Sequence, residues 1–112
     1  MVVEDDWSAR MAVSRILKML GFAVSEAATC GEAIAALKDE PEWILLDLML
    51  PDGCGIHVIH EAQSRSLSSK ICIVTGCDSD LLIQAHAAGA MHTFIKPLNI
   101  DRLMSVMKCS AV

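Results

Sequence analysis

Short apolar runs alternate along this chain with longer segments of helical periodicity. The runs are rich in β-branched residues, and the segments between them repeat apolar residues at a spacing of three and four positions. This alternation is typical of parallel strands that are connected by crossover helices. Five strand–helix units can be counted, so we expect an α/β fold with five parallel strands and five helices.

The boundaries of these elements follow from breakers and caps. Strands are expected at 1–3, 22–26, 43–46, 71–74 and 91–95. Helices are expected at about 7–20, after a Thr29 cap, at about 56–67 and 78–88, and from about 99. The first helix should bury a stripe of Val13, Ile16, Leu17 and Leu20, and the last a face of Ile100, Leu103, Met104 and Met107. Residues 48–55, which include Pro51 and two glycines, are expected to form a loop.

Composition narrows the possible classes of protein. A length of 112 residues predicts one domain over 1–112, and 54% hydrophobic against 21% charged residues excludes disorder. The net charge of -5 argues against direct binding of nucleic acid or anionic lipid. We expect a cytoplasmic protein, because the sequence shows neither a membrane span nor a leader and its five cysteines suit a reducing compartment.

Polar residues follow four of the five expected strands. They are Glu4, Asp5 and Asp6 after the first, Asp47 after the third, Thr75 after the fourth and Lys96 after the fifth. In open parallel sheets, ligands bind beyond the carboxyl ends of the strands where the winding reverses. If the first and third strands are neighbours in a doubly wound sheet, then Glu4, Asp5 and Asp47 meet at one edge.

Crowded carboxylates either take up protons or bind a cation, and an all-oxygen cluster suits Mg²⁺. A carboxylate can also act as a nucleophile toward phosphorus if cationic groups absorb the charge, and Lys96 and Thr75 could serve there. Plainer interpretations exist for each group. Glu4–Asp6 could be an acidic helix cap, Lys96 a surface lysine, and Thr75 an ordinary strand residue.

Four motifs in this order resemble the receiver domains of bacterial two-component response regulators. They are VVEDD (2–6), WILLDLMLPDGCG (43–55), CIVTG (72–76) and GAMHTFIKP (89–97), and the resemblance covers essentially the whole chain. It implies a flavodoxin-like, doubly wound sheet with strand order 2-1-3-4-5, two helices on one face and three on the other.

The resemblance also implies roles for individual residues. Asp47 would be the phosphoryl acceptor, Asp5 the main metal ligand with Glu4 assisting through water, and the Met49 carbonyl a further ligand of Mg²⁺ or Mn²⁺. Thr75 would be the switch hydroxyl and Lys96 the phosphate-pairing lysine, followed by a cis peptide to Pro97. A sensor histidine kinase or a histidine phosphotransfer protein would be the donor, and the domain would catalyse only its own phosphorylation and dephosphorylation.

Several positions depart from that family's pattern. Thr93 stands where an aromatic switch residue is common, with Phe94 on the next, inward position, so we expect coupling through Thr75 and the loop that follows it. Met49 and Cys77 flank the acceptor and the hydroxyl without an obvious group to orient water, which predicts a persistent phosphoryl group.

The remaining cysteine and histidine candidates are expected to be incidental. Cys54 is interpreted as a small loop residue, and His57 and His60 as exposed residues without a third zinc ligand. His86 and His92 are given no role.

Charged residues are sparse after residue 70, which leaves the fourth and fifth helices unusually apolar. We expect exposed apolar area from Leu81, Leu82, Ile83, Met91, Leu98 and Met107. Such a face usually marks a partner surface, so a homodimer or an effector is expected at the fourth helix, fifth strand and fifth helix.

Three alternatives compete with a phosphoaspartate switch. An aspartyl-nucleophile phosphatase or phosphotransferase usually has a second acid two residues after the nucleophile, where this chain has Met49. A flavodoxin-like nucleotide binder would need a Ser/Thr/Gly-rich loop where this chain has EDDW. A degenerate receiver that serves only as an interaction module is disfavoured because every expected polar group is present.

Overall fold

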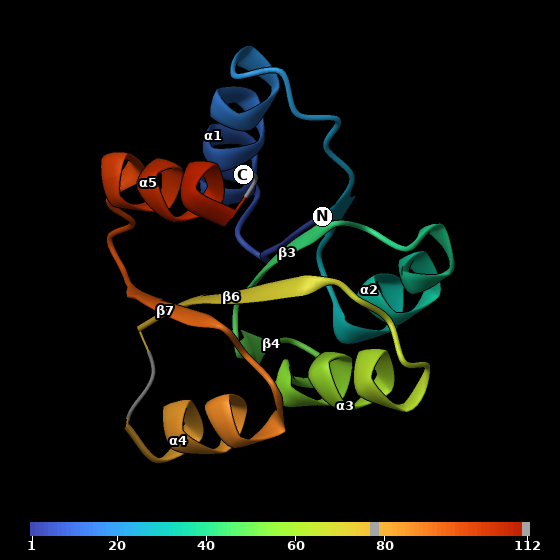
Figure 1. Ribbon diagram of the computed structural model, residues 1–112. Coiled ribbons are helices and arrows are strands. Elements are labelled where there is room, and N and C mark those ends of the chain that lie inside the picture. The colour runs from blue at the N-terminus through green and yellow to red at the C-terminus, as the bar shows by residue number, and fades with distance from the viewer. Residues whose placement is uncertain (77–78, 111–112) are drawn as a thin grey trace.

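Five short strands form one parallel sheet with the spatial order β2-β1-β3-β6-β7 (Figure 1). The computed structural model describes residues 1–76 and 79–110. The strands are β1 (Val2–Val3), β2 (Glu26–Ala27), β3 (Trp43–Leu46), β6 (Lys70–Thr75) and β7 (His92–Ile95). Counted within this sheet, the order is the 2-1-3-4-5 that the sequence resemblance implied, so the flavodoxin-like prediction is confirmed.

Five helices cover the two faces of the sheet, with α1 and α5 on one side and α2, α3 and α4 on the other (Figure 1). Their bounds are α1 (Trp7–Met19), α2 (Cys30–Ala36), α3 (Ile56–Ser64), α4 (Ser79–Ala88) and α5 (Ile100–Ser110). A short 3₁₀ turn, η1 (Leu37–Asp39), extends α2. The expected Thr29 cap is present, since its side chain accepts a hydrogen bond from the Glu32 amide.

Successive side chains of the central strands point to opposite faces of the sheet, which divides the core into two clusters. Ile44 and Leu46 pack with α2, α3 and α4, whereas Leu45 packs with Leu17 of α1 and Leu103 of α5. All four residues of β3 are buried, as expected of a central strand with helices on both faces.

Three predicted boundaries were wrong. The second strand is Glu26–Ala27 rather than 22–26, because its paired length is set by the two residues of β1 beside it. The third helix ends at Ser64 rather than at residue 67, because Ser66 adopts a left-handed conformation and the Leu67 amide returns to the Ala62 carbonyl. The expected loop 48–55 contains two short antiparallel strands, β4 (Met49–Leu50) and β5 (Gly53–Cys54).

The predicted apolar stripe of α1 is only partly buried. Leu17 is buried, but Val13 and Ile16 are half-buried and Leu20 is exposed. On α5, Leu103 and Met107 are buried, whereas Ile100 and Met104 are half-buried. The two apolar faces are therefore buried around Leu17 on α1 and around Leu103 and Met107 on α5, and only partly elsewhere.

Gly55, at the start of α3, lies very close to the backbone that follows β3. A Cβ atom built on Gly55 would lie 2.4 Å from the Asp47 carbonyl oxygen and 3.1 Å from the Leu48 Cα. The Gly55 amide donates to the Leu48 carbonyl over 2.9 Å, so the two backbones cannot separate without losing that bond. A side chain at residue 55 would therefore displace the backbone that carries Asp47.

We expect Gly55→Ala to lower the free energy of unfolding by about 1–3 kcal/mol, the usual range for a side chain forced into packed backbone. Urea denaturation measures this. Gly76→Ala is the matched control, because nothing lies within 4 Å of a Cβ there, and its effect should stay within about 0.5 kcal/mol. Equal stabilities for the two variants would contradict the steric argument.

Candidate functional site

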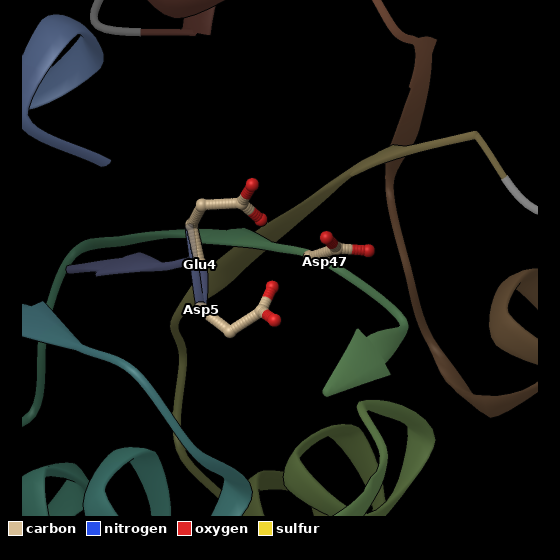
Figure 2. Close-up of side chains that lie close together, drawn as sticks. All are labelled: Glu4, Asp5 and Asp47. Atoms are coloured by element: carbon tan, nitrogen blue, oxygen red, sulfur yellow. The ribbon is translucent and has the colours of Figure 1, made fainter. Parts of the chain in front are cut away.

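Three carboxylates from two adjacent strand ends meet at one edge of the sheet. Glu4 and Asp5 follow β1, Asp47 follows β3, and the register pairs Val3 with Leu46 immediately before them. Figure 2 shows the side chains of Glu4 and Asp5 leaving the chain on opposite sides and both bending toward Asp47. One oxygen from each residue lies within 4.8 Å of the others. The convergence expected from the sequence is therefore present.

Asp47 is held by donors from three further positions. Its Oδ1 accepts hydrogen bonds from the Thr75 hydroxyl over 3.1 Å and from the Met49 amide over 3.0 Å. Its Oδ2 accepts from Lys96 Nζ over 2.8 Å, and the same ammonium donates to Glu4 Oε1 over 2.9 Å. Thr75 ends β6 and Lys96 follows β7, so consecutive strands of the sheet supply all of these side chains. The Lys96–Pro97 peptide is cis, as the sequence resemblance implied.

Burial makes the carboxylates differ in acidity. Removal from water, together with the neighbouring Asp47, raises the pKa of Glu4 to about 7 despite its ion pair with Lys96. Burial also opposes ionisation of Asp47, yet hydrogen bonds from Glu4, Lys96 and the Met49 amide outweigh it and lower the pKa of Asp47. The pKa of Asp47 therefore lies below that of Glu4, so Asp47 is the carboxylate that more readily ionises.

The same site fits a divalent cation. Glu4 Oε2 is buried and has no hydrogen-bond partner among the described residues, although it lies beside other carboxylates. An orphaned buried oxygen costs free energy that a cation would recover. Mg²⁺ and Mn²⁺ prefer oxygen ligands and retain waters, and the exposed side of Asp5 leaves room for water. The donor set is therefore suited to the metal that the sequence predicted.

Supporting contacts fix this edge, and the sequence analysis missed two of them. Arg10 of α1 donates to the Glu4 carbonyl over 2.7 Å and to the Glu26 carboxylate over 3.1 Å, which ties β1 to β2. Asp52 accepts from the Cys30 and Gly31 amides at the start of α2 and thereby anchors the β4–β5 segment. In the sequence, the position of Arg10 one helical turn after Asp6 was the only indication that it could contact this edge of the sheet.

Residues 4–6 include both a helix cap and site residues, so each of the two interpretations of this acidic run applies to part of it. Asp6 is the N-cap of α1 and accepts from the Ala9 amide over 2.7 Å, so the plain capping interpretation holds for that residue. Glu4 and Asp5 instead face Asp47.

His86 makes two contacts that the sequence did not indicate. Its Nδ1 lies 3.0 Å from the Ala90 carbonyl oxygen, and its Nε2 contacts the Thr93 hydroxyl. A histidine of α4 is thus bonded to the residue that replaces the usual aromatic. His57 and His60 are exposed as predicted, and the metal-ligand group found in the described part of the chain contains neither. Phe94 points inward and is 2% exposed, also as predicted.

Cysteine outcomes are mixed. Cys77 lies outside the described residues. Cys30, Cys54 and Cys72 are free thiols, and burial raises the pKa of Cys30 and of Cys72 to about 11. The Cys54 side chain is half-buried, and its carbonyl accepts a hydrogen bond from the Cys30 thiol. Nothing in these contacts departs from the structural role expected for Cys54.

Apolar side chains are exposed on α4 and β7. Ile83 is 67% exposed, Ile95 54% and Met91 49%. Leu81, Leu82 and Leu98 are half-buried, whereas Met107 is 3% exposed and packs in the core, so its expected exposure was wrong. Among residues 1–76 and 79–110, no helix combines the length and the apolarity needed to cross a membrane.

Comparisons with known proteins agree with this geometry. The family model described as the response regulator receiver domain matches residues 1–108. The transcriptional regulatory protein CitT of Bacillus subtilis (strain 168) is 33% identical over 110 residues, which cover 95% of this chain and 49% of that protein. Three of the curated relatives are matched over only 28%, 49% and 56% of their own length, so this chain corresponds to one part of them.

Solved structures match over nearly the whole chain. A CheY-like response regulator receiver domain protein from Methanospirillum hungatei JF-1 is 31% identical with a TM-score of 0.91, covering 97% of this chain and 89% of that one. A response regulator protein from Burkholderia pseudomallei, described with a phosphorylated aspartic acid, a calcium ion and citrate, is 27% identical with a TM-score of 0.85. That match covers 93% of this chain and 62% of the other.

Replacing Glu4 with Gln should stabilise the metal-free protein at high pH. Because the pKa of Glu4 is raised from 4.5 to about 7, its ionised form destabilises the folded state above pH 7, whereas glutamine stays neutral. After allowance for solvent screening, we expect Glu4→Gln to be about 1–2 kcal/mol more stable than wild type at pH 8. The difference should decline as the pH falls from about 7 to 4.5 and should vanish below 4.5, where Glu4 is protonated in both the folded and the unfolded state.

Thermal unfolding in chelator at pH 5 and pH 8 measures this effect. Glu42→Gln, at an exposed position, is the control and should show no comparable pH dependence. Added Mg²⁺ should stabilise wild type more than Glu4→Gln, because the metal favours the charged carboxylate. A Glu4→Gln variant that is less stable than wild type at pH 8 in chelator would show that the ion pair with Lys96 outweighs the burial cost.

Proposed function

Because this chain belongs to the response regulator receiver domain family, we propose that Asp47 is the acceptor of its phosphoryl group. Receiver domains are phosphoaspartate signalling modules of two-component systems. The observation that supports Asp47 most directly is its environment. It is a buried carboxylate with a lowered pKa, and Lys96 and Thr75 donate to its two oxygens. An ionised carboxylate is the form that can attack phosphorus.

The proposed reaction transfers the phosphoryl group from a phosphohistidine of a sensor histidine kinase or a histidine phosphotransfer protein. An Asp47 carboxylate oxygen attacks phosphorus, the P–N bond of the phosphoimidazole breaks, and its electron pair returns to the imidazole nitrogen. The product is an acyl phosphate on Asp47 and a neutral histidine once that nitrogen takes a proton from water. Lys96 then pairs with the added negative charge, and the Thr75 hydroxyl is near enough to donate to a phosphoryl oxygen.

We propose that Asp5, Asp47, Glu4 and the Met49 carbonyl hold Mg²⁺ or Mn²⁺ for this reaction. The bound cation would neutralise the charge that develops on the transferring phosphoryl oxygens. The carboxylate cluster and the orphaned Glu4 Oε2 support this ligand set. The calcium ion and phosphorylated aspartate described for the Burkholderia pseudomallei protein support a site of the same kind here.

An aspartyl-nucleophile phosphatase is the weaker alternative. Two residues after Asp47, the Met49 side chain is 60% exposed and offers no acid to protonate a leaving group. The Met49 side chain also has no polar group that could orient a water molecule for attack on the acyl phosphate, which supports a persistent phosphoryl group. A degenerate receiver is opposed by the intact set of Asp47, Thr75 and Lys96 around one point.

The proposed output surface is the apolar face of α4, β7 and α5, defined by Ile83, Met91 and Ile95. An effector or a second receiver would bind there after phosphorylation. The net charge of -5 argues against direct contact of this domain with nucleic acid, and a cytoplasmic setting fits a kinase partner and free thiols.

The central test is phosphorylation in vitro. Incubation with acetyl phosphate and Mg²⁺ should add one phosphoryl group to the intact mass of wild type and none to Asp47→Asn. Chelation of the metal should abolish the addition. Asp52→Asn, which changes an acid in the adjacent hairpin, is the control and should still be modified. An unmodified wild-type protein, or an Asp47→Asn variant that gains the same mass, would overturn the proposal.

Thr75→Val tests how the site communicates with α4. The variant lacks the hydroxyl that bonds Asp47, so we expect it to gain a phosphoryl group while amide chemical shifts of α4 change by less than about half of the wild-type amount. Thr75→Ser keeps the hydroxyl and should respond like wild type. A full α4 response in phosphorylated Thr75→Val would show that the coupling bypasses this residue.

A further inference from the structure

A cavity of about 610 Å³ lies on the α1–α5 face of the sheet. Its walls come from Ala9, Ala12 and Val13 of α1 and from Leu98 and Ile100 at the start of α5. Residues of β1, β3 and β6 form its floor, so the cavity lies between the sheet and the two helices that cover this face. Ile16 of α1 and the strand-end residues Glu4, Lys96 and Pro97 complete the lining. Small-molecule sites typically have volumes of about 300–1,000 Å³, which includes this one.

The cavity explains why the predicted stripes of α1 and α5 are not fully buried. Val13, Ile16 and Ile100 are half-buried although each belongs to an apolar helix face that the sequence directs inward. Ala9 and Ala12 are too small to fill the space in front of them. Apolar side chains that face an accessible cavity retain surface that a suitable ligand would remove from water.

The polar groups of the cavity decide the kind of ligand. Glu4 and Lys96 are the charged residues in its lining, and they already pair with each other over 2.9 Å. Lys96 is further engaged by Asp47 over 2.8 Å. An anionic ligand would lose its hydration without gaining an uncommitted cation, because Lys96 already pairs with two carboxylates, and a cationic ligand would be repelled by the Lys96 ammonium beside Glu4. An uncharged apolar ligand has no such cost.

We propose that this cavity is a binding site for a small, uncharged, apolar molecule of about two fused or linked rings. The cavity borders the phosphoacceptor site through Glu4 and Lys96, but Asp47 is not part of its lining and its occupancy needs no phosphorylation. The proposal therefore stands or falls independently of the role of Asp47.

The test uses two fluorescent probes that share one ring system. N-phenyl-naphthylamine is neutral, whereas anilinonaphthalene sulfonate carries a negative charge, and both fluoresce more strongly in apolar surroundings. We expect the unphosphorylated chain of residues 1–112 to bind the neutral probe at least about tenfold more tightly than the sulfonate, because only the sulfonate must desolvate a charge. Fluorescence titration measures both affinities.

Variants locate the bound probe. Ala12→Phe places a ring in the cavity and should weaken binding of the neutral probe by about tenfold or more, while Arg15→Phe adds the same ring to α1 at a position outside the lining. Arg15→Phe should bind as wild type does. Amide chemical shifts of Val13 and Leu98 should move on titration in wild type and in Arg15→Phe, and circular dichroism confirms that each variant is folded.

Three results would overturn the proposal. The first is no fluorescence change with the neutral probe, and the second is equal binding by Ala12→Phe and wild type. The third is loss of probe binding as the protein concentration rises together with dimer formation in sedimentation, which would show that a second copy fills the cavity. If Ala12→Phe fails to fold, Ala9→Leu replaces it under the same criteria, and the shifts of Val13 and Leu98 decide the location.

Discussion

The burial of two carboxylates beside each other is the constraint on which this structure depends. Glu4 and Asp47 lie at the ends of neighbouring strands, and water is largely removed from both. Two ionised carboxylates in such a place would repel each other. The ammonium group of Lys96 forms an ion pair with both and so reduces this repulsion. The Thr75 hydroxyl and the Met49 amide complete the environment of Asp47. Each compensating group comes from a different segment, so the strand register itself is coupled to the chemistry.

The part of this arrangement that strand ends determine could be predicted from the sequence. Asp47 follows a buried apolar run, and polar residues follow three other strands. Because the strands are parallel, all of these residues lie at the same edge of the sheet. The contacts of Arg10, Asp52 and His86 could not be predicted, because each depends on the tertiary position of a helix or hairpin relative to the residues it contacts. The β4–β5 hairpin was missed for a related reason. Its two pairs, Met49 with Cys54 and Leu50 with Gly53, have no periodic pattern long enough to detect.

Alanine shows why packing on the two faces was harder to foresee than the fold. On the α2, α3 and α4 side, Ala33, Ala62 and Ala85 are buried to 2% exposure or less, and the helices approach the sheet closely. On the other side, Ala9 and Ala12 face a cavity instead. The residue type is the same in both cases, and each alanine lies in a helix. What differs is the position of the helix axis relative to the sheet, a tertiary property that local pattern does not encode.

One backbone pair of the sheet connects the surroundings of Asp47 with the exposed apolar residues of β7. Thr75 of β6 is paired in register with Ile95 of β7, and the Lys96 amide donates to the Thr75 carbonyl over 3.1 Å. Ile95 is exposed on the proposed output surface, so under the proposed function a shift of Thr75 toward a phosphoryl group would reach that surface through one backbone pair. Two positions before Ile95, Thr93 contacts His86 of α4. A polar contact between α4 and β7 therefore occupies the place where a rotating ring is common in this family, and the backbone pair at Thr75 remains the direct connection between the two sites.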